Sequence, residues 1–288
     1  MPLDPQQLMN RPFQDVVHTY KARDTMLYAL AVGLGSDPVD EQQLPFVYEE
    51  HLKALPTMAL VLGDTGFWLQ EPDTGIDWPK VLYGEIGIEL HAPLPSTGVV
   101  VGRTTVDEII DKGPGKGAFL YTSRAVTEQG SGQPLCTVRS TYICRGDGGF
   151  GGSVGTVRQP HPLPQRQADA LCDLPILRQA ALLYRLTGDF NPLHVDPAVA
   201  RGVGFDRPIL HGLCTFGVAG HALLKTLCHY EPERIVGLRA RFSSPVFPGE
   251  TLRTEIWREA PGRAGFRCRV LERDVVVLDH GVCEYHDA

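Results

Sequence analysis

One short segment of the sequence holds three side chains that can do acid–base chemistry together. Asp189, Asn191 and His194 place an acid, an amide and an imidazole within six residues. Gly188 just before them favours a turn, and Pro192 lies between the amide and the imidazole. Local geometry can therefore direct Asp189 and His194 at one point, where a carboxylate and an imidazole that share a water act as general acid and base.

A glycine at the start of an apolar stretch supplies a further element of such a site. Gly212 opens a run whose apolar residues recur every three or four positions, which predicts a helix. These apolar positions are Leu213, Phe216, Ala219, Leu223 and Leu227. A free backbone N–H at a helix N-terminus binds negative charge, and glycine permits close approach. Acid, base and oxyanion donor together indicate chemistry beside a thioester carbonyl.

The neighbouring side chains have simpler interpretations. Tyr184 is expected in the core, and His211 is expected to hydrogen-bond the loop 202–208, with a direct chemical role as the alternative. Cys214 lies just inside the helix, where the pKa of a thiol is lowered. Addition of water needs no covalent intermediate, so we do not expect Cys214 to be a nucleophile.

The same residues resemble a known family. The run G-D-F-N-P-L-H (188–194), followed by G-F-D-R-P-I-L-H-G-L-C-T-F-G (204–217), is similar to the signature of the MaoC-like, (R)-specific enoyl-CoA hydratases of type 2, which include the hydratase unit of peroxisomal multifunctional enzyme type 2. Further blocks that resemble the family follow in order along nearly the whole chain. They are residues 23–35, 55–57, 84–85, 111–113, 148–152 and 241–252.

The resemblance implies both a fold and a reaction. The fold is an α+β double hot-dog, in which two antiparallel sheets are each wrapped on a central helix. The reaction is the reversible hydration of a trans-2-enoyl-CoA to a (3R)-3-hydroxyacyl-CoA. Asp189 and His194 would hold the water, one taking its proton while the other delivers a proton to C2. Asn191 would orient the water or the substrate oxygen, and the Gly212 N–H would bind the thioester oxygen. No metal or redox cofactor is implied, because coenzyme A is part of the substrate.

The resemblance also implies a substrate-binding set: Tyr83, Gly84, Lys112 and Phe242. In the family, an H-G-E strand start and a D-K-G loop contact the acyl-CoA. Tyr83 stands where the family has histidine, which leaves a backbone contact in place but questions the side-chain contact. Lys112 would meet a phosphate, with a solvated surface lysine as the alternative. Phe242 matches a ligand-lining position, with a core aromatic as the alternative.

The chain divides into two halves with a similar plan. Residues 146–167 are rich in Gly, Pro and Gln and indicate a linker. We predict an N-terminal hot-dog over 1–155 and a catalytic C-terminal hot-dog over 166–288. Helices over 23–33 and 55–63 would correspond to helices over 177–188 and 210–222. The first half has no histidine where the second has His194, so it is expected to accommodate the acyl chain.

Alternation of apolar and polar residues at 99–106 and 252–257 predicts a strand in each half, and further strands are predicted after each of these. The predicted strands fall at 99–106, 118–126, 136–144, 252–257, 265–271 and 275–285. Gly217 and Gly220 each lower the helix propensity of the 210–222 helix by ~1 kcal/mol. A helix that tolerates this cost is expected to be packed closely by the sheet that wraps it.

The composition of the chain limits which partners and which cellular compartment are expected. Apolar content of 43% is that of a globular protein, and a net charge of −7, with 21 arginines and six lysines, argues against nucleic-acid binding. Seven scattered cysteines without a C-x-x-C pair predict reduced thiols and no zinc site. No signal peptide or membrane span is expected, and the C-terminus is not S-K-L. We therefore expect a cytoplasmic protein (peroxisomal if eukaryotic), as a homodimer or a pseudo-dimeric monomer.

Other functions remain as alternatives. A hot-dog thioesterase usually needs a carboxylate on the central helix, and residues 213–227 contain no Asp or Glu. A non-catalytic acyl-CoA-binding module has no use for the set of Asp189, Asn191 and His194. A (3R)-hydroxyacyl-ACP or -CoA dehydratase uses the same site, and the carrier, the direction and the chain length are left open.

Overall fold

Ten strands form one antiparallel sheet in the computed structural model, which describes residues 3–151 and 157–287 of the chain. Their order across the sheet is β1-β3-β4-β5-β2-β7-β10-β9-β8-β6. The first half contributes β1 (Val16–Tyr20), β2 (Val81–Leu90), β3 (Gly98–Asp111), β4 (Ala118–Glu128) and β5 (Pro134–Cys144). The second contributes β6 (Ala170–Pro175), β7 (Ile235–Phe242), β8 (Thr251–Ala260), β9 (Arg263–Val270) and β10 (Val275–Tyr285). All six predicted strands are present.

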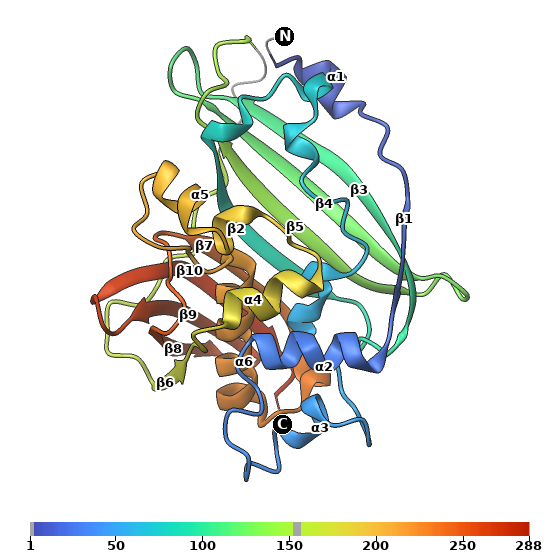
Figure 1. Cartoon of the computed structure of the whole chain (residues 1–288), viewed down its shortest axis with the longest axis vertical. Coiled ribbons are helices and arrows are strands. Elements are labelled where there is room, and N and C mark those ends of the chain that lie inside the picture. Colours follow the sequence, from blue (N-terminus) through green and yellow to red (C-terminus); the bar gives the residue numbers. More distant parts are fainter. Residues whose placement is uncertain (1–2, 152–156, 288) are drawn as a thin grey trace.

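The two halves are joined edge to edge. Strand β2 pairs antiparallel with β7, with Ile86 opposite Ala240, so the two expected sheets are one continuous sheet. Figure 1 shows the green strands of the first half above the orange and red strands of the second. Strand β3 extends beyond the predicted residue 106, because its pairing with β4 resumes after a bulge between Val106 and Glu108.

Three of the four predicted helices are α-helices in the structure. The predicted helices over 23–33, 177–188 and 210–222 appear as α2 (Ala22–Ala31), α4 (Ala180–Tyr184) and α6 (Gly212–Cys228). Helix α4 is shorter than predicted, because its last turn tightens into the 3-10 helix η5 (Arg185–Thr187). The other helices of the described residues are α1 (Pro5–Met9), α3 (Leu44–Val47), α5 (Pro197–Gly202), η1 (Pro56–Val61), η2 (Trp68–Gln70), η3 (Pro72–Thr74), η4 (Trp78–Lys80), η6 (Pro192–His194) and η7 (Pro232–Arg234).

Helix α6 packs against both halves. It contacts β6, β7, β8 and β10 of its own half and the 3-10 helix η1 (Pro56–Val61) of the other. A Cβ at Gly217 would lie 2.6 Å from the Val32 side chain, and one at Gly220 would lie 2.4 Å from that of Thr57. The expectation of close packing is confirmed, but the residues packed most tightly on the two glycines belong to the α2 and η1 segments rather than to the wrapping sheet.

The predicted helix over 55–63 is wrong in type. This segment forms η1, a six-residue 3-10 helix, so the first half, as far as its residues are described, has no long central helix corresponding to α6. Pro56 occupies its first turn, and Gly63, with a φ of 60°, lies just beyond its end. 3-10 helices seldom extend beyond a few residues because their hydrogen-bond geometry is poor. The segment is buried as expected, but it fills less of the interior than a long central helix.

One large apolar core runs through both halves. It includes Tyr28 and Ile86 of the first half and Phe216 and Leu238 of the second. A second, smaller cluster lies only in the first half, around Trp68 and Leu120. All seven cysteines are buried thiols without disulfides. Within the described ranges, no helix has both the length and the apolar character needed to cross a bilayer. Two hot-dog halves sharing a sheet and a core make a double hot-dog fold.

Candidate active site

The turn after η5 sets the position of Asp189. Gly188 ends η5 with a φ of 130°, a backbone conformation that glycine adopts far more readily than other residues. The Thr187 hydroxyl donates to the Tyr184 carbonyl at 2.7 Å and stabilises the same turn. Asp189 follows at once and is half-buried, and its carboxylate accepts the Asn191 N–H at 3.2 Å. One carboxylate oxygen is therefore fixed by the local backbone.

His194 is held in one tautomer by the backbone. It ends the 3-10 helix η6 (Pro192–His194), is buried, and its Nδ1 lies 2.9 Å from the Ile209 carbonyl oxygen. A carbonyl only accepts hydrogen bonds, so Nδ1 carries the proton and Nε2 keeps a lone pair. Burial lowers the pKa of His194, against smaller opposing effects of this hydrogen bond and of the Asp189 charge. The ring is thus a neutral base at ordinary pH.

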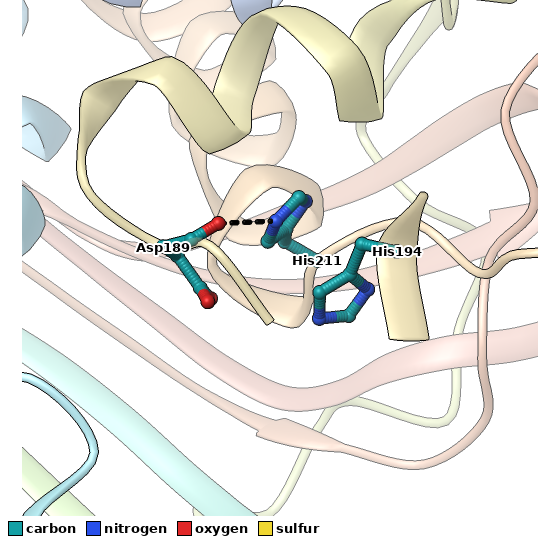
Figure 2. A group of neighbouring side chains, drawn as sticks. All are labelled: Asp189, His194 and His211. Carbon is teal, nitrogen blue, oxygen red and sulfur yellow. Dashed lines mark hydrogen bonds between the residues drawn. The ribbon is translucent and has the colours of Figure 1, made fainter. Parts of the chain in front are cut away.

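His211 lies between these two residues. Its Nε2–H donates to the backbone carbonyl of Asp189 at 3.2 Å, and its ring lies 3.8 Å from that of His194 between centroids (Figure 2). Burial, and then the charge of His194, lowers the pKa of His211 to about 3, so it is neutral. One ligand atom from each of Asp189, His194 and His211 lies within 4.8 Å of the others. The predicted acid–base pair is therefore brought together in space.

The start of α6 adjoins this cluster. Gly212 is its first residue, directly after His211, and is exposed. First-turn N–H groups have no partner inside a helix, and the His211 side chain makes no capping hydrogen bond to them. A Cβ at Gly212 would lie 3.0 Å from the Phe242 ring, so the absence of a side chain lets β7 approach. The predicted oxyanion donor and Phe242 are thus neighbours.

Asn191 has a local structural contact. Its side-chain oxygen accepts the Leu193 N–H at 3.0 Å and caps η6, the helix that carries His194. Its side chain is exposed. This contact positions His194 and engages the amide oxygen, while the expectation that the amide orients the water or the substrate oxygen stays a prediction.

Tyr83 reaches the site through Phe242. The two rings pack edge to face with centroids 5.5 Å apart, and Tyr142 packs on Tyr83 at 4.8 Å. The Tyr83 hydroxyl is hydrogen-bonded to Ser140 Oγ. Gly84 lies at a bulge where β2 and β5 change register. The first half therefore contributes Tyr83 to the packing of Phe242, the ring that faces Gly212. The substrate-binding roles of Tyr83 and Gly84 stay predictions.

Lys112 lies away from the acid–base pair. It is exposed just beyond the end of β3, and its Nζ lies 5.5 Å from the centre of the Phe119 ring. Asp111 before it accepts backbone N–H groups of Gly113, Gly149 and Gly151, which hold the pKa of its carboxyl below the usual value. The loop is therefore well anchored to the glycine-rich segment, although Lys112 makes no contact with Asp189, His194 or Gly212 among the described residues.

Asp189, His194 and His211 are residue types that bind metal ions, but one ring nitrogen of each histidine is already hydrogen-bonded. His194 Nδ1 and His211 Nε2 both lie at carbonyl oxygens, which leaves one nitrogen of each ring and the Asp189 carboxylate for an ion. The absence of a metal cofactor stays a prediction.

A cavity of about 560 Å³ lies elsewhere, lined by Trp78, Asp77 and Asp147 among others. Its carboxylates have the wrong charge for phosphate, so we do not place coenzyme A there.

Sequence reasoning missed two elements of the site. His211 was expected to bond the loop 202–208, whereas it holds Asp189 and stacks on His194. The Ile209 carbonyl, which sets the tautomer of His194, is a backbone atom, and a sequence gives no signal for its direction. The sequence signal that could have found them is that Ile209 and His211 lie within three residues of Gly212, the predicted oxyanion donor.

Comparison with known proteins gives the family. The family model described as MFE-2 hydratase 2 N-terminal domain matches residues 18–146, and the model described as MaoC like domain matches residues 160–280. The chain is 40% identical to 3-hydroxyacyl-thioester dehydratase Y of Mycobacterium tuberculosis, over 99% of both chains. It is 38% identical to the peroxisomal enoyl-CoA hydratase 2 of Arabidopsis thaliana, over 94% of this chain and 92% of the other.

A solved structure agrees with these relatives. The crystal structure of a MaoC-like dehydratase from Phytophthora capsici superposes with a TM-score of 0.85, is 35% identical, and is covered over 98% of this chain and 99% of that one. The protein belongs to the family of MaoC-like hydratases and dehydratases whose first half is the hydratase 2 N-terminal domain.

Proposed function

We propose that the protein is an (R)-specific enoyl-CoA hydratase, a hydro-lyase that adds water reversibly to trans-2-enoyl-CoA to give (3R)-3-hydroxyacyl-CoA. The observation that carries the proposal is the placement of Asp189 and His194 within 4.8 Å of each other beside the N-terminus of α6. Relatives that cover nearly the whole chain are named enoyl-CoA hydratase 2 and 3-hydroxyacyl-thioester dehydratase, which are the two directions of one reaction.

The hydrogen bonds of the pair favour His194 as the group that moves the proton. Its Nδ1–H is engaged by Ile209, so Nε2 is free to accept a proton from water. The Asp189 carboxylate accepts the other O–H of this water and stabilises the imidazolium, in line with its effect of raising the pKa of His194. A positioned base contributes roughly 10²–10⁴-fold to a rate.

The electrons and the proton balance in two linked events. Hydroxide from the water bonds to C3 while its proton goes to His194 Nε2, and the C2–C3 π electrons move into the thioester as an enolate. The Gly212 N–H binds the enolate oxygen, for which one donor contributes roughly 10²–10³-fold. His194 then returns the proton to C2 on the same face. In this mechanism His194 carries out both proton transfers, whereas the expectation from the sequence divides them between Asp189 and His194.

The substrate-binding roles are part of the same proposal. Phe242 and Tyr83 would line the entry of the acyl chain into the first half, next to Gly212. Lys112 would meet a phosphate of coenzyme A from its exposed loop. No metal or redox group is needed for these steps. The site Asp189, Asn191, His194 and Gly212 belongs entirely to the second half, which we propose is the catalytic one.

The direct test is hydration of crotonyl-CoA and decenoyl-CoA, followed as loss of the enoyl absorbance, with chiral analysis of the product. The proposal requires the (3R) alcohol. An (S) product, or release of free acid without hydration, would refute it. Helix α6 has no Asp or Glu, the residue type that a hot-dog thioesterase is expected to need there, so we expect no release of free acid.

The proposal extends to the assembly and the location of the protein, and a separate experiment tests each. The shared sheet makes the chain a pseudo-dimer by itself, and we propose that it acts as such, alone or as a homodimer. Light scattering gives the mass that decides between them. Seven buried thiols suit a reducing compartment, and we propose the cytoplasm, with cell fractionation as the test.

A further inference from the structure

The inner face of the first-half sheet is interrupted by polar residues. On β4, Leu120 belongs to the smaller apolar cluster and Val126 to the larger one. Side chains two residues apart share a face of a strand, so Thr122 and Arg124 lie between the two clusters. Both are buried. An apolar face thus changes to polar and back within one strand.

The neighbouring strands continue this pattern. Thr104 of β3 is opposite Arg124, and Ser140 of β5 is opposite Thr122. Thr104 lies between Val100 and Val106, which belong to the larger and the smaller cluster respectively. We name the four residues Thr104, Thr122, Arg124 and Ser140 the polar band. It crosses three adjacent strands and separates the two apolar clusters.

The polar band is connected to the candidate active site. Ser140 Oγ is hydrogen-bonded to the Tyr83 hydroxyl, and the Tyr83 ring packs on Phe242, which lies against Gly212. Ser140, Tyr83 and Phe242 are only half-buried, although each lies beside the interior of the fold. These contacts form a continuous series from Gly212 to the band, and an acyl chain whose thioester lies on Gly212 would reach the band along Phe242 and Tyr83.

The band retains unused hydrogen-bonding capacity. Thr104 Oγ1 and Arg124 Nε are both buried and have no hydrogen-bond partner within the described part of the chain. These two residues are directly opposite each other, so their side chains are cross-strand neighbours. Buried polar atoms without partners are uncommon because they cost free energy, and a bound polar group is one reason for their presence.

The charge of Arg124 indicates what kind of group fits. One terminal nitrogen pairs with the Asp64 carboxylate, and the other donates to the Leu60 carbonyl at 2.6 Å and more weakly to that of Ala59. The guanidinium is thus already neutralised by a carboxylate. The remaining donor and the threonine hydroxyls suit a neutral oxygen rather than a second anion.

We propose that the preferred substrates carry a neutral oxygen group, a hydroxyl or a keto group, on the acyl chain remote from the thioester, and that the polar band binds it. This inference rests on the proposed hydratase function and narrows its substrate class. An unsubstituted alkyl chain would leave the buried polar atoms unpaired.

The test compares matched substrates and matched variants. The substrates are trans-2-hexadecenoyl-CoA, a set of its isomers hydroxylated at successive distal carbons, and the ω-carboxylated analogue. The variants are Thr104→Val and Thr122→Val, which remove a hydroxyl from the band. Thr105→Val is the control, because Thr105 is exposed on the other face of β3 and bonds Asp107 and Ser123.

We expect at least one hydroxylated isomer to exceed the unsubstituted substrate in kcat/KM. The quantity compared is the ratio of kcat/KM for that hydroxylated isomer to kcat/KM for the unsubstituted substrate. Thr104→Val and Thr122→Val should each reduce this ratio about 2- to 12-fold, the equivalent of one hydrogen bond of about 0.5–1.5 kcal/mol. Thr105→Val should leave it unchanged. Thr104→Val should not lower Tm, because it removes an unpaired hydroxyl, which separates a binding role from a structural one.

Three results would overturn the inference. They are a wild-type preference for the unsubstituted chain over every hydroxylated isomer, a change of ratio in the band variants no larger than in Thr105→Val, and a preference for the carboxylated chain, which would mean that an anion displaces Asp64. In each of these, hydration of crotonyl-CoA continues. A wild-type protein that hydrates neither crotonyl-CoA nor any long substrate instead refutes the hydratase proposal, and this inference with it.

Discussion

Replacement of His211 by leucine tests whether this residue holds the site or only fills space. Its ring is 1% exposed, its Nε2–H bonds the Asp189 carbonyl, and its pKa is lowered to about 3. Leucine removes the hydrogen bond and the titrating group together. A small displacement of Asp189 is sufficient to cost catalysis, because a 1 Å error in the position of a catalytic group lowers a rate about 100-fold. We expect kcat to fall about 10- to 100-fold.

The magnitude of the effect on stability follows from linkage. The pKa of His211 is lower in the folded protein than the ordinary 6.5 of the unfolded chain, so the unfolded state binds more protons below pH 6.5. Stability is therefore full above pH 6.5 and falls as the pH decreases towards 3. At pH 5, about 1.5 pH units below 6.5, the free energy of unfolding of the wild type is therefore lower by about 2 kcal/mol, at 1.36 kcal/mol per unit.

Urea unfolding at pH 7.5 and pH 5 measures this term. The stability gap between wild type and His211→Leu should narrow by about 2 kcal/mol at the lower pH, since leucine does not titrate. His221→Leu is the matched control. Burial lowers the pKa of His221 to about 4, but it bonds Val32 and Tyr230, away from Asp189.

The two variants together decide the role of His211. His221→Leu should show a similar narrowing with a smaller loss of kcat. A gap that stays constant with pH in His211→Leu would contradict the buried neutral state of the ring. Equal losses of kcat in both variants would remove the positioning role and leave His211 as a core residue.

Other variants test the remaining roles. Asp189→Asn and His194→Gln should each lower kcat about 10²–10⁴-fold with little change in Tm, and equal losses of stability and rate would make both residues structural. In the wild type, kcat/KM should decline on the acid side with a midpoint below 6.5, because burial lowers the pKa of His194 and the protonated ring is not a base; a midpoint above 6.5 contradicts this. Lys112→Ala should raise KM for CoA thioesters more than it lowers kcat, and a pantetheine thioester without the phosphates should show no such effect. The fragment of residues 165–288 should be insoluble or inactive, since β7 loses β2 and α6 loses η1, and an active soluble fragment would show that the halves are independent.

The positions of the strands and of the acid–base pair could be predicted because they depend on local patterns. Alternation at 99–106 and 252–257 predicted parts of β3 and β8, and Asp189 and His194 are brought together by a turn of a few residues. Helix α6 was predicted from its apolar spacing alone. Such features need no knowledge of what packs against them.

Features that depend on distant parts of the chain could not be predicted. The segment 55–63 has the apolar content of a helix, but Pro56 and Gly63 limit it to η1, and its burial comes from α6 and β5 in three dimensions. The stacking of His211 on His194 requires the approach of two loops. Enlarging Ala59 of the segment 55–63 would not be a clean test of an acyl pocket in the first half. Ala59 is fully buried in the core, so a phenylalanine there would cost about 1–3 kcal/mol by overpacking before it reached any substrate.

The covalent connection of two hot-dog halves explains how such a site can arise. In a symmetric homodimer every substitution occurs twice, so a central helix shortened in one copy is shortened in both. Here the second half has the long helix α6, which begins at Gly212, while the described part of the first half has the short 3-10 helix η1 in the corresponding place. Gly217 and Gly220 let α6 pack closely on that shorter partner, and Tyr83 and Phe242 close the interface beside Gly212. Under the proposed function, the first half therefore helps to position the Gly212 N–H through Tyr83 and Phe242, and its inner sheet face, which carries no acid–base pair, specifies which acyl chain is bound.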